Sequence, residues 1–392
     1  MSDWREESLG AVCSRLRSGS GITSKDIHQS GEVPVFGGNG IRGYTSEANF
    51  SGECAIIGRQ GAYCGNVRYF RGTARMSEHA VVACADPEND TRFLAYLLST
   101  MNLGRLSGQA AQPGLSVKVL ARQPLRLPPL ETQRRIAAIL GSIDDLIENN
   151  RRRIELLEQM AQAIYREWFV HFRYPGHEND ELVDSPLGPI PSGWEWDTLD
   201  AVCSVRTDSA DPRQLDPATP TVGLEHIGRQ RFTLTNWDQA NSVASRKLRF
   251  EKGDVLFGKI RPYFHKVALA PFDGICSSDA IVLRPTDGWS EFTLLTVFSD
   301  AFVAHAVATS NGTKMPRADW KVLRSWAIPT PPIDTLSAFG SRIRPLLDLS
   351  VSLQGQTTVL AHLRDLLLPK LVTGEIDVST LDLGGALEKA RA

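Results

Sequence analysis

A glycine-rich segment, Gly38-Asn39-Gly40-Ile41-Arg42-Gly43, contains the residues whose spacing most resembles a site of chemistry. Its G-x-G-x-x-G pattern follows an apolar run, Val33–Phe36, as in loops that bind dinucleotides or S-adenosylmethionine. Such a loop requires a helix that begins at its third glycine. The residues between Tyr44 and Gly52 have no helical periodicity, so the sequence favours a glycine-rich surface loop. In such a loop, Asn39 and Arg42 can approach a polymer backbone or a base edge.

Basic residues concentrate in two blocks of the chain, residues 1–126 and 192–328. Arginines lie among Gln, Gly and Tyr residues near position 60, and Lys and Arg recur near position 260. Clusters of this kind can bind phosphate groups, and the alternative is ordinary solvated surface charge. The residues for which we predict nucleic-acid contacts are Asn39, Arg42, Arg59, Gln60, Arg68, Arg105, Lys259, Arg261, Lys314 and Arg317.

Motifs of well-known catalytic sites are absent from the sequence. It has no N-P-P-[YFW] or D-P-P-Y motif of amino-methyltransferases, no G-x-x-x-x-G-K-[ST] loop, and no H-E-x-x-H or G-x-S-x-G motif. The six cysteines occur singly and without clustered histidines, which is typical of reduced thiols in a core. We therefore expect no catalytic residues and no metal site in this chain.

The chain contains an internal repeat. Leu9–Ser14 recurs as Leu199–Ser204 with an offset of 190, and Lys118–Leu120 recurs as Lys321–Leu323 with an offset of 203. A Pro-Pro pair follows in each copy. Each copy therefore consists of a β-rich block, with short apolar runs bounded by Gly, Asp, Asn and Pro, and then a long helical stretch.

A long helix is predicted after each Pro-Pro pair. The stretch from Glu131 to about Val170 has no Pro and one Gly, and apolar residues recur in it every seven positions. Five heptads with two apolar positions each are typical of coiled-coil packing. Pro345 predicts a kink or a late start of the second helix, and Pro369 and Gly374 mark its end. The residues assigned to the seam are Ile136, Ile143, Asn150, Leu157, Ile164, Phe339, Leu346, Leu353, Leu360 and Leu367, joined by Leu349 and Leu363 in the second helix.

Two such helices in one chain can pair with each other. We expect antiparallel pairing, because a whole globular block between them lets the chain turn back. The predicted fold is α+β, with two α/β domains separated by two long antiparallel coiled-coil helices in a pseudo-two-fold repeat. Asn150 either fixes the register of this pair or lies where the seam opens to solvent, and both interpretations stand.

The composition is that of an ordinary globular protein. Apolar residues make up 42% and charged residues 22% of the 392 residues, and the formal net charge is -2. An anionic partner must therefore be bound by local basic patches. The sequence has no apolar run long enough to span a membrane and no N-terminal secretory signal, and we expect a cytoplasmic location.

The sequence resembles the specificity (S) subunits of type I restriction-modification systems. Four segments carry the resemblance, in the order of that family: Pro34–Tyr44, Leu127–Ala137, Trp168–Val170 and Leu368–Ile376. The resemblance extends over essentially the whole chain. One departure is Thr330–Gly340, where the second copy lacks the Gln and the Ile-Ala of the usual boundary.

This resemblance implies a DNA-reading subunit without catalytic activity of its own. Each target recognition domain would read one half of an asymmetric, bipartite site in double-stranded DNA. Two modification subunits, which methylate adenine at N6, would bind the spacer helices, and restriction subunits would join that core. S-adenosylmethionine, ATP and Mg²⁺ would serve those partners, with no cofactor in this chain and no membrane involved.

The resemblance also implies domain boundaries. They are target recognition domain 1 at 1–126, spacer helix 1 at 127–175, target recognition domain 2 at 192–328, spacer helix 2 at 329–373 and a tail at 374–392. Three alternatives remain at this point. They are a stand-alone methyltransferase that binds S-adenosylmethionine through the Gly38 loop, a non-catalytic coiled-coil scaffold without DNA affinity, and an orphan DNA-binding subunit without active partners.

Overall fold

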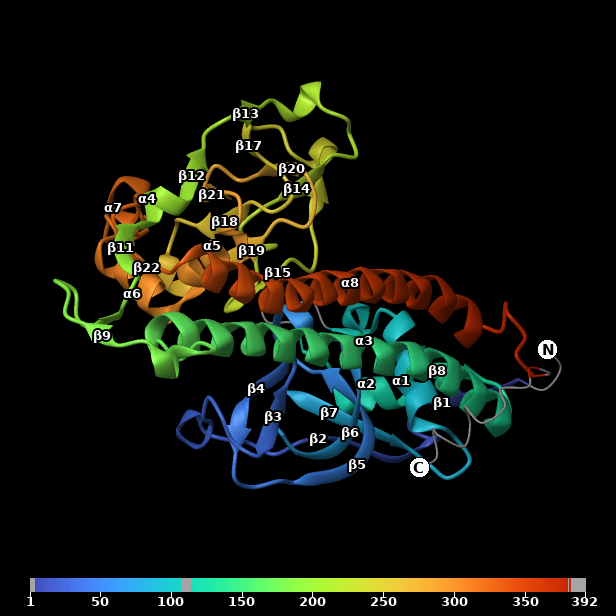
Figure 1. Ribbon diagram of the computed structural model, residues 1–392. Helices are drawn as coiled ribbons and strands as arrows, with labels where there is room; N and C mark the ends of the chain where they lie inside the picture. The colour runs from blue at the N-terminus through green and yellow to red at the C-terminus, as the bar shows by residue number, and fades with distance from the viewer. Residues whose placement is uncertain (1–3, 108–113, 380, 382–392) are drawn as a thin grey trace. The chain divides into compact units, whose positions relative to one another are not determined.

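The computed structural model describes residues 4–107, 114–379 and 381 of the chain (Figure 1). Most of the predicted tail, at 380 and 382–392, lies outside these described residues. The chain divides into two compact units: unit 1 contains Met1–Leu146 and Leu360–Ala392, and unit 2 contains Ile147–Val359.

Two long helices each contribute one segment to unit 1 and another to unit 2. They are α3 (Leu130–Tyr165), which continues as a π-helical turn, η4 (Arg166–Val170), and α8 (Ile333–Val372). Figure 1 draws α3 in green and α8 in orange to red. Both helices follow a Pro-Pro pair, as predicted, and the rest of each unit is α/β, which confirms the predicted fold class.

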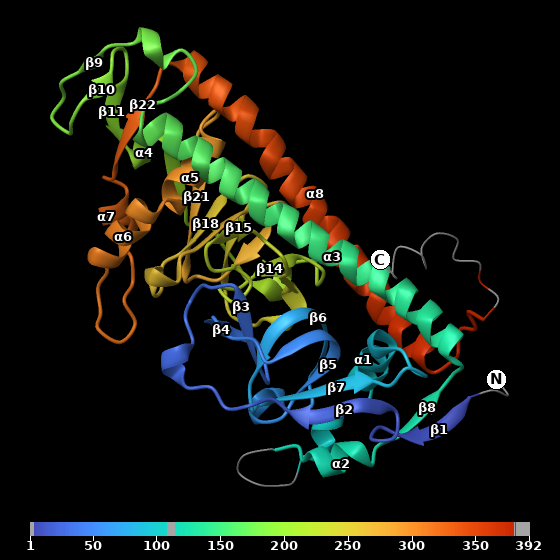
Figure 2. The same cartoon turned by 90° about the horizontal axis from the view of Figure 1, so that it is seen from below.

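Unit 1 is built on a six-stranded sheet with the order β2-β7-β5-β6-β3-β4 (Figure 2). Its central strand β5 is buried on both faces, because Ala55 and Ile57 join one apolar cluster and Cys54 and Ile56 join the other. Helix α1 (Thr91–Thr100) covers the first of these faces. The strands are β2 (Cys13–Ser18), β3 (Val33–Gly37), β4 (Gly40–Thr45), β5 (Phe50–Gly58), β6 (Val67–Met76) and β7 (Ala80–Ala85).

Unit 2 contains two five-stranded sheets, with the orders β12-β21-β18-β19-β15 and β13-β17-β20-β14-β16. Helices α5 (Ser290–Phe298) and α6 (Asp300–Ala308) pack on the first sheet, and the second sheet packs on its other face. The strands of the first sheet are β12 (Cys203–Arg206), β15 (Arg231–Thr233), β18 (Val255–Gly258), β19 (Lys266–Leu269) and β21 (Ala280–Pro285). Those of the second are β13 (Ser209–Ala210), β14 (Pro220–Val222), β16 (Asp238–Gln239), β17 (Lys247–Phe250) and β20 (Gly274–Cys276).

The remaining elements are short. In unit 1 they are β1 (Arg5–Ser8), η1 (Ser24–Asp26), η2 (Gly61–Tyr63), η3 (Leu103–Leu106), α2 (Val117–Ala121) and β8 (Pro124–Leu127). In unit 2 they are η5 (His177–Asn179), β9 (Leu182–Val183), β10 (Ile190–Pro191), β11 (Glu195–Thr198), α4 (Leu199–Val202), η6 (Pro212–Gln214), η7 (Ala240–Ser242), η8 (Pro262–Phe264), α7 (Trp320–Leu323) and β22 (Ala327–Thr330).

The strand registers of the two units agree with the internal repeat. The order β2-β7-β5-β6 in unit 1 matches β12-β21-β18-β19 in unit 2. Gly58 lies opposite Ala80, and Gly258 lies opposite Ala280. The small sheets also agree, because β1 pairs with β8 and β11 pairs with β22 in the same register. The two units are therefore copies of one strand framework.

In each unit a segment of α3 packs against a segment of α8. In unit 1 the first turns of α3 share a core with Leu371 and Val372 at the end of α8. In unit 2 the order is reversed, since the ring of Trp168, just after α3, lies 5.6 Å from that of Phe339 at the start of α8. The two helices therefore run in opposite directions, as predicted.

The seam of α8 differs in part from the predicted one. Leu353 is buried as expected, but Leu349 and Leu363 are 39% and 42% exposed, so their assignment to the seam was wrong. Ser350 and Thr357 are buried instead. Each hydroxyl donates to the carbonyl oxygen four residues earlier (2.9 Å in both cases), which satisfies a polar group inside the seam.

Helix α8 is continuous through Pro345, which contradicts a late start, and the alternative of a kink stays a prediction. Pro345 is exposed, where the carbonyl that loses its helical partner can reach water. The helix ends at Val372, two residues before Gly374, whose φ of +77° suits a helix C-terminus. The sequence left two interpretations of Asn150. This residue is 5% exposed, which contradicts an opening of the seam to solvent there.

An ion pair ties each α/β domain to a helix segment, with opposite polarity in the two units. In unit 1 Arg92 of α1 binds Asp145 of α3 (Nη2–Oδ1 2.6 Å) and the carbonyl oxygen of Gly141 (3.0 Å). In unit 2 Glu291 of α5 binds Arg344 of α8 (Oε1–Nε 2.7 Å). Gly141 makes room for the first pair, because a Cβ there would lie 2.6 Å from the guanidinium carbon of Arg92.

Both helices also bind the backbone of unit 2, α3 within β15 and α8 just after it. The carboxylate of Glu158 on α3 accepts hydrogen bonds from the backbone N–H of Phe232 (3.2 Å) and Thr233 (2.8 Å). The amide of Gln354 on α8 donates to the carbonyl oxygen of Thr235 (3.0 Å). An edge strand is thus covered by side chains of the helices.

Among the described helices, none is by itself long and apolar enough to cross a membrane. The bent pair formed by α5 and α6 meets the requirement by length and composition alone. Helix α5 is buried in the core of unit 2.

Candidate nucleic-acid interface

The glycine-rich segment of unit 1 forms a β-hairpin. Gly37 of β3 lies opposite Gly40 of β4, so Gly38 and Asn39 make a two-residue turn. Gly40 has a φ of +103°, a conformation that glycine adopts without a steric penalty. Since a strand and not a helix follows the glycines, the segment lacks the geometry of a dinucleotide loop, and the favoured interpretation as a surface loop agrees with the structure.

The hairpin turn approaches the end of β5 backbone to backbone. A Cβ at Gly58 would lie 2.6 Å from the carbonyl oxygen of Gly38, and a Cβ at Gly38 would lie 3.4 Å from that of Gln60. Glycine is therefore needed at position 58, whereas a Cβ at Gly38 would make an ordinary van der Waals contact. The crossing brings Asn39 close to Arg59 and Gln60, which the sequence had placed in separate loops.

Two arginines fold over the same hairpin. The side chain of Arg42 covers Gly37, where a Cβ would come within 2.5 Å of Arg42 Cδ. Arg68 at the start of β6 covers Gly40, at 3.3 Å from a Cβ to Nη1. Both arginines remain exposed. The exposed guanidinium groups of Arg42 and Arg68 therefore both lie against the hairpin.

Arg105 belongs to a different element, next to another loop of unit 1. It lies on η3, and the backbone of Gly104 packs so closely on Gly65 that a Cβ there would be 2.1 Å from Gly104 N. Gly65 follows η2, the turn after Arg59 and Gln60. Arg105 is thus adjacent to the η2 turn and not to the hairpin.

In unit 2 the predicted residues meet beside the end of β18. The backbone N–H of Lys259 donates to the carbonyl oxygen of Asp279 (3.0 Å), and that of Arg261 donates to Pro316 (2.7 Å). Ile260 forms a β-bridge with Arg317, whose guanidinium lies 3.6 Å from the carboxylate of Asp279. Lys314 is exposed on the preceding turn.

A cavity of about 570 Å³ lies beside these residues and is lined by Lys259, Arg317, Asn311 and Arg206, among others. Arg206 was missed in the sequence. It binds Asp208 and Glu251 (both 2.7 Å), so its charge is balanced within the protein. Asn311 was also missed, and only its β-bridge with Arg317, which no sequence pattern indicates, brings it to the site.

Some other basic residues of the two blocks have partners inside their own unit. Arg71 pairs with Glu53 (3.5 Å), and Arg75 pairs with Glu47 (4.0 Å). The ammonium group of Lys266 donates to the carbonyl oxygen of Leu224. These residues have partners within their own unit, as Arg317 does in Asp279 (3.6 Å).

The cysteines are not suited to nucleophilic chemistry. All six are free thiols. Burial raises the pKa of Cys54, Cys203 and Cys276 to about 12, so these three remain protonated at neutral pH.

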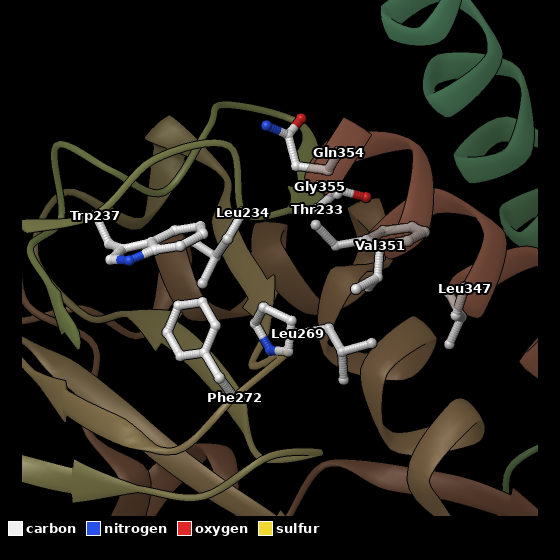
Figure 3. A pocket seen from close by; sticks show the side chains of 11 residues that line it. Thr233, Leu234, Trp237, Leu269, Phe272, Leu347, Val351, Gln354 and Gly355 are labelled. Atoms are coloured by element: carbon white, nitrogen blue, oxygen red, sulfur yellow. The ribbon is translucent and has the colours of Figure 1, made fainter. Parts of the chain in front are cut away.

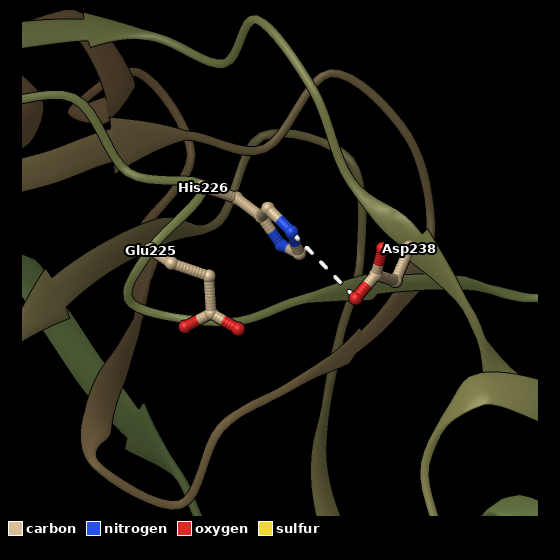
Figure 4. Close-up of side chains that lie close together, drawn as sticks. All are labelled: Glu225, His226 and Asp238. Carbon is tan, nitrogen blue, oxygen red and sulfur yellow. Dashed lines mark ion pairs between the residues drawn. The ribbon is translucent and has the colours of Figure 1, made fainter. Parts of the chain in front are cut away.

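One group within the described residues could by proximity hold a metal ion: Glu225, His226 and Asp238 (Figure 4). The backbone N–H of Gly223 donates to Nδ1 of His226 (2.9 Å), so Nε2 bears the proton in the neutral ring. Nε2 lies 3.7 Å from the carboxylate of Asp238. A metal ion would require the lone pair of Nε2 and would break the Gly223 hydrogen bond. The arrangement therefore suits a histidine–aspartate contact better than a metal centre.

An apolar pocket of about 160 Å³ lies between α8 and the strands of unit 2 (Figure 3). Trp237 and Phe272 pack edge to face at one side, 4.5 Å apart, and Leu347 and Val351 of α8 lie at another. None of the residues that line it is ionisable. The pocket offers apolar contact and no group for phosphate binding or acid–base chemistry.

The chain is similar to proteins of one kind. Residues 1–159 match a family model described as the type I restriction modification DNA specificity domain. The type I restriction enzyme EcoprrI specificity subunit of Escherichia coli is 40% identical over 146 residues, which are 36% of this chain and 36% of that protein. The MjaIX specificity subunit of Methanocaldococcus jannaschii is 26% identical over 306 residues, 74% of this chain and 70% of that protein.

A solved structure has a similar fold. The crystal structure of the type I restriction-modification S subunit from M. genitalium matches with a TM-score of 0.60 at 16% identity, over 94% of this chain and 96% of that one. By sequence, the chain matches only about a third of the length of the Escherichia coli relative.

Proposed function

We propose, on the premise that this chain belongs to the family of type I restriction-modification specificity subunits, that it is the DNA-recognition subunit of such a system. It has no catalytic activity of its own in this proposal. Unit 1 reads one half of an asymmetric, bipartite DNA site through its target recognition domain, and unit 2 reads the other half. Because it binds DNA in this proposal, we place its action in the cytoplasm.

One observation supports this proposal above the others. The two units repeat the same strand register, and in both units a basic residue, Arg59 or Lys259, follows the strand that ends at Gly58 or Gly258. Both residues are followed by an equivalent β-bridge, Gln60 with Gly114 and Ile260 with Arg317, but the side chains around them differ. Unit 1 has Arg42 of the hairpin, and unit 2 has Arg317 where unit 1 has Gly114. A common framework with different basic surroundings suits two half-sites of different sequence.

The partners and the division of the chain belong to the same proposal. Two adenine-N6 modification subunits bind α3 and α8, and restriction subunits join the complex. S-adenosylmethionine, ATP and Mg²⁺ are held by those partners. The proposed target recognition domains are 1–126 and 192–328, the spacer segments are 127–175 and 329–373, and 374–392 is the tail. The proposed DNA contacts are the ten residues predicted from the sequence: Asn39, Arg42, Arg59, Gln60, Arg68, Arg105, Lys259, Arg261, Lys314 and Arg317.

The test is to co-express this chain with a cognate modification subunit and to sequence the host DNA for methylated adenine. We expect one split motif, methylated on both strands. Replacing residues 1–126 by the corresponding domain of a relative should change one half of the motif and leave the other half intact. Arg42→Ala should relax the motif only within the half read by unit 1, at a cost of about 1–3 kcal/mol in discrimination.

Two results would contradict the proposal. A well-formed complex that methylates no adenine would indicate an orphan subunit. Failure to form any complex would favour a scaffold with other partners. Arg71→Ala is the matched control. Arg71 lies on β6 three residues after Arg68 and so faces the other side of the sheet, and the motif should stay unchanged.

A further inference from the structure

Both units carry the same loop after the strand that ends at Gly58 or Gly258. The backbone N–H of Arg59 donates to the carbonyl oxygen of His79 (2.9 Å), as that of Lys259 does to Asp279 (3.0 Å). The offset is 200 residues at each of these positions. The next segment also agrees, because Leu115 donates to the carbonyl oxygen of Arg59 and Ala318 to that of Lys259 (2.8 Å in both).

The backbone of this loop is conserved between the units even where the residue types differ. Gly61 and Gly65 have φ values of +77° and +85°, and the equivalent residues Arg261 and His265 have +50° and +51°. Glycine adopts these values freely, whereas an arginine and a histidine are strained there. Unit 2 therefore keeps the loop shape against a steric penalty, as functional sites do.

The same side chain projects from both copies of the loop. Tyr63 and Tyr263 are the equivalent residues, and each is 51% exposed. Tyr63 closes η2, and Tyr263 lies within η8 on the ring of Phe264 (4.8 Å between centroids). Each tyrosine comes four residues after a basic residue, Arg59 or Lys259. A phenol and a cation on one rigid loop are suited to phosphate and sugar groups.

We propose that this repeated loop binds the sugar–phosphate backbone at the same position in each half-site, with the phenol of Tyr63 or Tyr263 donating a hydrogen bond to a phosphate oxygen. The proposal rests on the proposed function and specifies its contacts. Two half-sites of different sequence have the sugar–phosphate backbone in common. A loop with the same structure in both units therefore suits that common backbone.

By the same reasoning, we assign base recognition to the elements that differ between the two units. Within the described residues, the sheet of unit 1 continues from β3 to β4, whereas the equivalent sheet of unit 2 ends at β15. The hairpin with Asn39 and Arg42 is therefore particular to unit 1. In unit 2 the bridge of Asn311 and Arg317 lies next to the repeated loop, because Arg317 also bridges Ile260.

The experiment uses the complex of this chain with its modification subunits. The duplex that carries the methylated motif and a duplex with both half-sites scrambled are titrated at the same salt concentration by fluorescence anisotropy. We expect Tyr63→Phe and Tyr263→Phe each to weaken binding to both duplexes by the same factor, about fivefold, because each removes one hydrogen bond to phosphate. The methylated motif should not change. Arg59→Gln or Lys259→Gln should lower the slope of log affinity against log salt by about 1.

Lys118→Gln and Lys321→Gln are the matched controls. These lysines are also equivalent in the two units and exposed, but they lie on α2 and α7, outside the repeated loop. They should leave both affinities unchanged. The proposal is overturned if the tyrosine variants bind both duplexes normally, or if they weaken only the specific duplex and relax the motif, as base-reading residues would. If the unaltered complex binds neither duplex, the proposed function fails first, and this inference fails with it.

Discussion

At the scale of single residues, Glu158 is the side chain through which α3 binds a strand of unit 2. Its carboxylate accepts two backbone hydrogen bonds in a buried position, 2% exposed. Glu158→Ala would leave the N–H groups of Phe232 and Thr233 without that acceptor, and we expect a loss of about 2 kcal/mol in the free energy of unfolding of unit 2. Urea titration with tryptophan fluorescence measures it, since every tryptophan except Trp4 belongs to unit 2.

Glu158 should also make stability depend on pH. Burial raises its pKa above the ordinary value of 4.5, although the hydrogen bonds to Thr233 and Phe232 oppose this. An acid with a raised pKa in the folded state binds its proton more tightly there, so stability falls as pH rises from 4.5 through the folded pKa. Glu158→Gln should therefore gain stability relative to the unaltered protein between pH 4 and pH 7. A difference that stays constant over this range, or an equal effect of the exposed control Glu148→Gln, would contradict the assignment.

At the scale of elements, the sequence predicted the long helices but only part of their seam. Heptad spacing identified Ile136, Ile143 and Leu353, because buried aliphatic residues recur regularly. It failed at Ser350 and Thr357, since an apolar criterion overlooks small hydroxyl residues that satisfy themselves on the helix backbone. Leu349 and Leu363 were assigned in their place on hydrophobicity alone.

The corrected seam predicts unequal effects of the same substitution at two leucines of α8. Leu353 is 2% exposed, so Leu353→Asp would place a carboxylate in the packed seam and should cost about 3–5 kcal/mol. Leu349→Asp lies on the exposed side and should change stability by no more than about 0.5 kcal/mol. Leu346→Asp, at a half-buried position, should fall between them. The urea midpoint of unit 2 measures all three, and equal losses at Leu349 and Leu353 would restore the original seam.

At the scale of the whole molecule, the repeat could be predicted because offsets in the sequence correspond to strand registers. The offsets of 190 and 203 reappear in the pairing of β1 with β8 and of β11 with β22. The equivalence of the loops that bear Tyr63 and Tyr263 could not be predicted, since few identical residues mark the offset of 200 between them. The approach of Gly38 to Gly58 and Gln60 also required the structure, because a backbone crossing leaves no periodic signal.

Unit 1 is assembled from two distant parts of the chain. This assembly was likewise not predicted, and it has a measurable consequence. Leu371 and Val372 of α8 are 2% and 1% exposed in a core shared with Ile136 and Leu140 of α3. A chain that ends at Val359 lacks them and several neighbours, each worth about 2 kcal/mol when buried, which together approach the whole stability of a typical domain.

We therefore expect the chain that ends at Val359 to lose the fold of unit 1 while unit 2 stays folded. Hydrogen exchange should become fast in β5 and β7, and trypsin should cleave between residues 5 and 146. Tryptophan emission should remain native, because it reports almost entirely on unit 2. A control chain that ends at Ser379 retains α8 and should protect both units. Slow exchange in β5 and β7 of the shorter chain would mean that residues 5–146 fold without α8, which the shared core of unit 1 argues against.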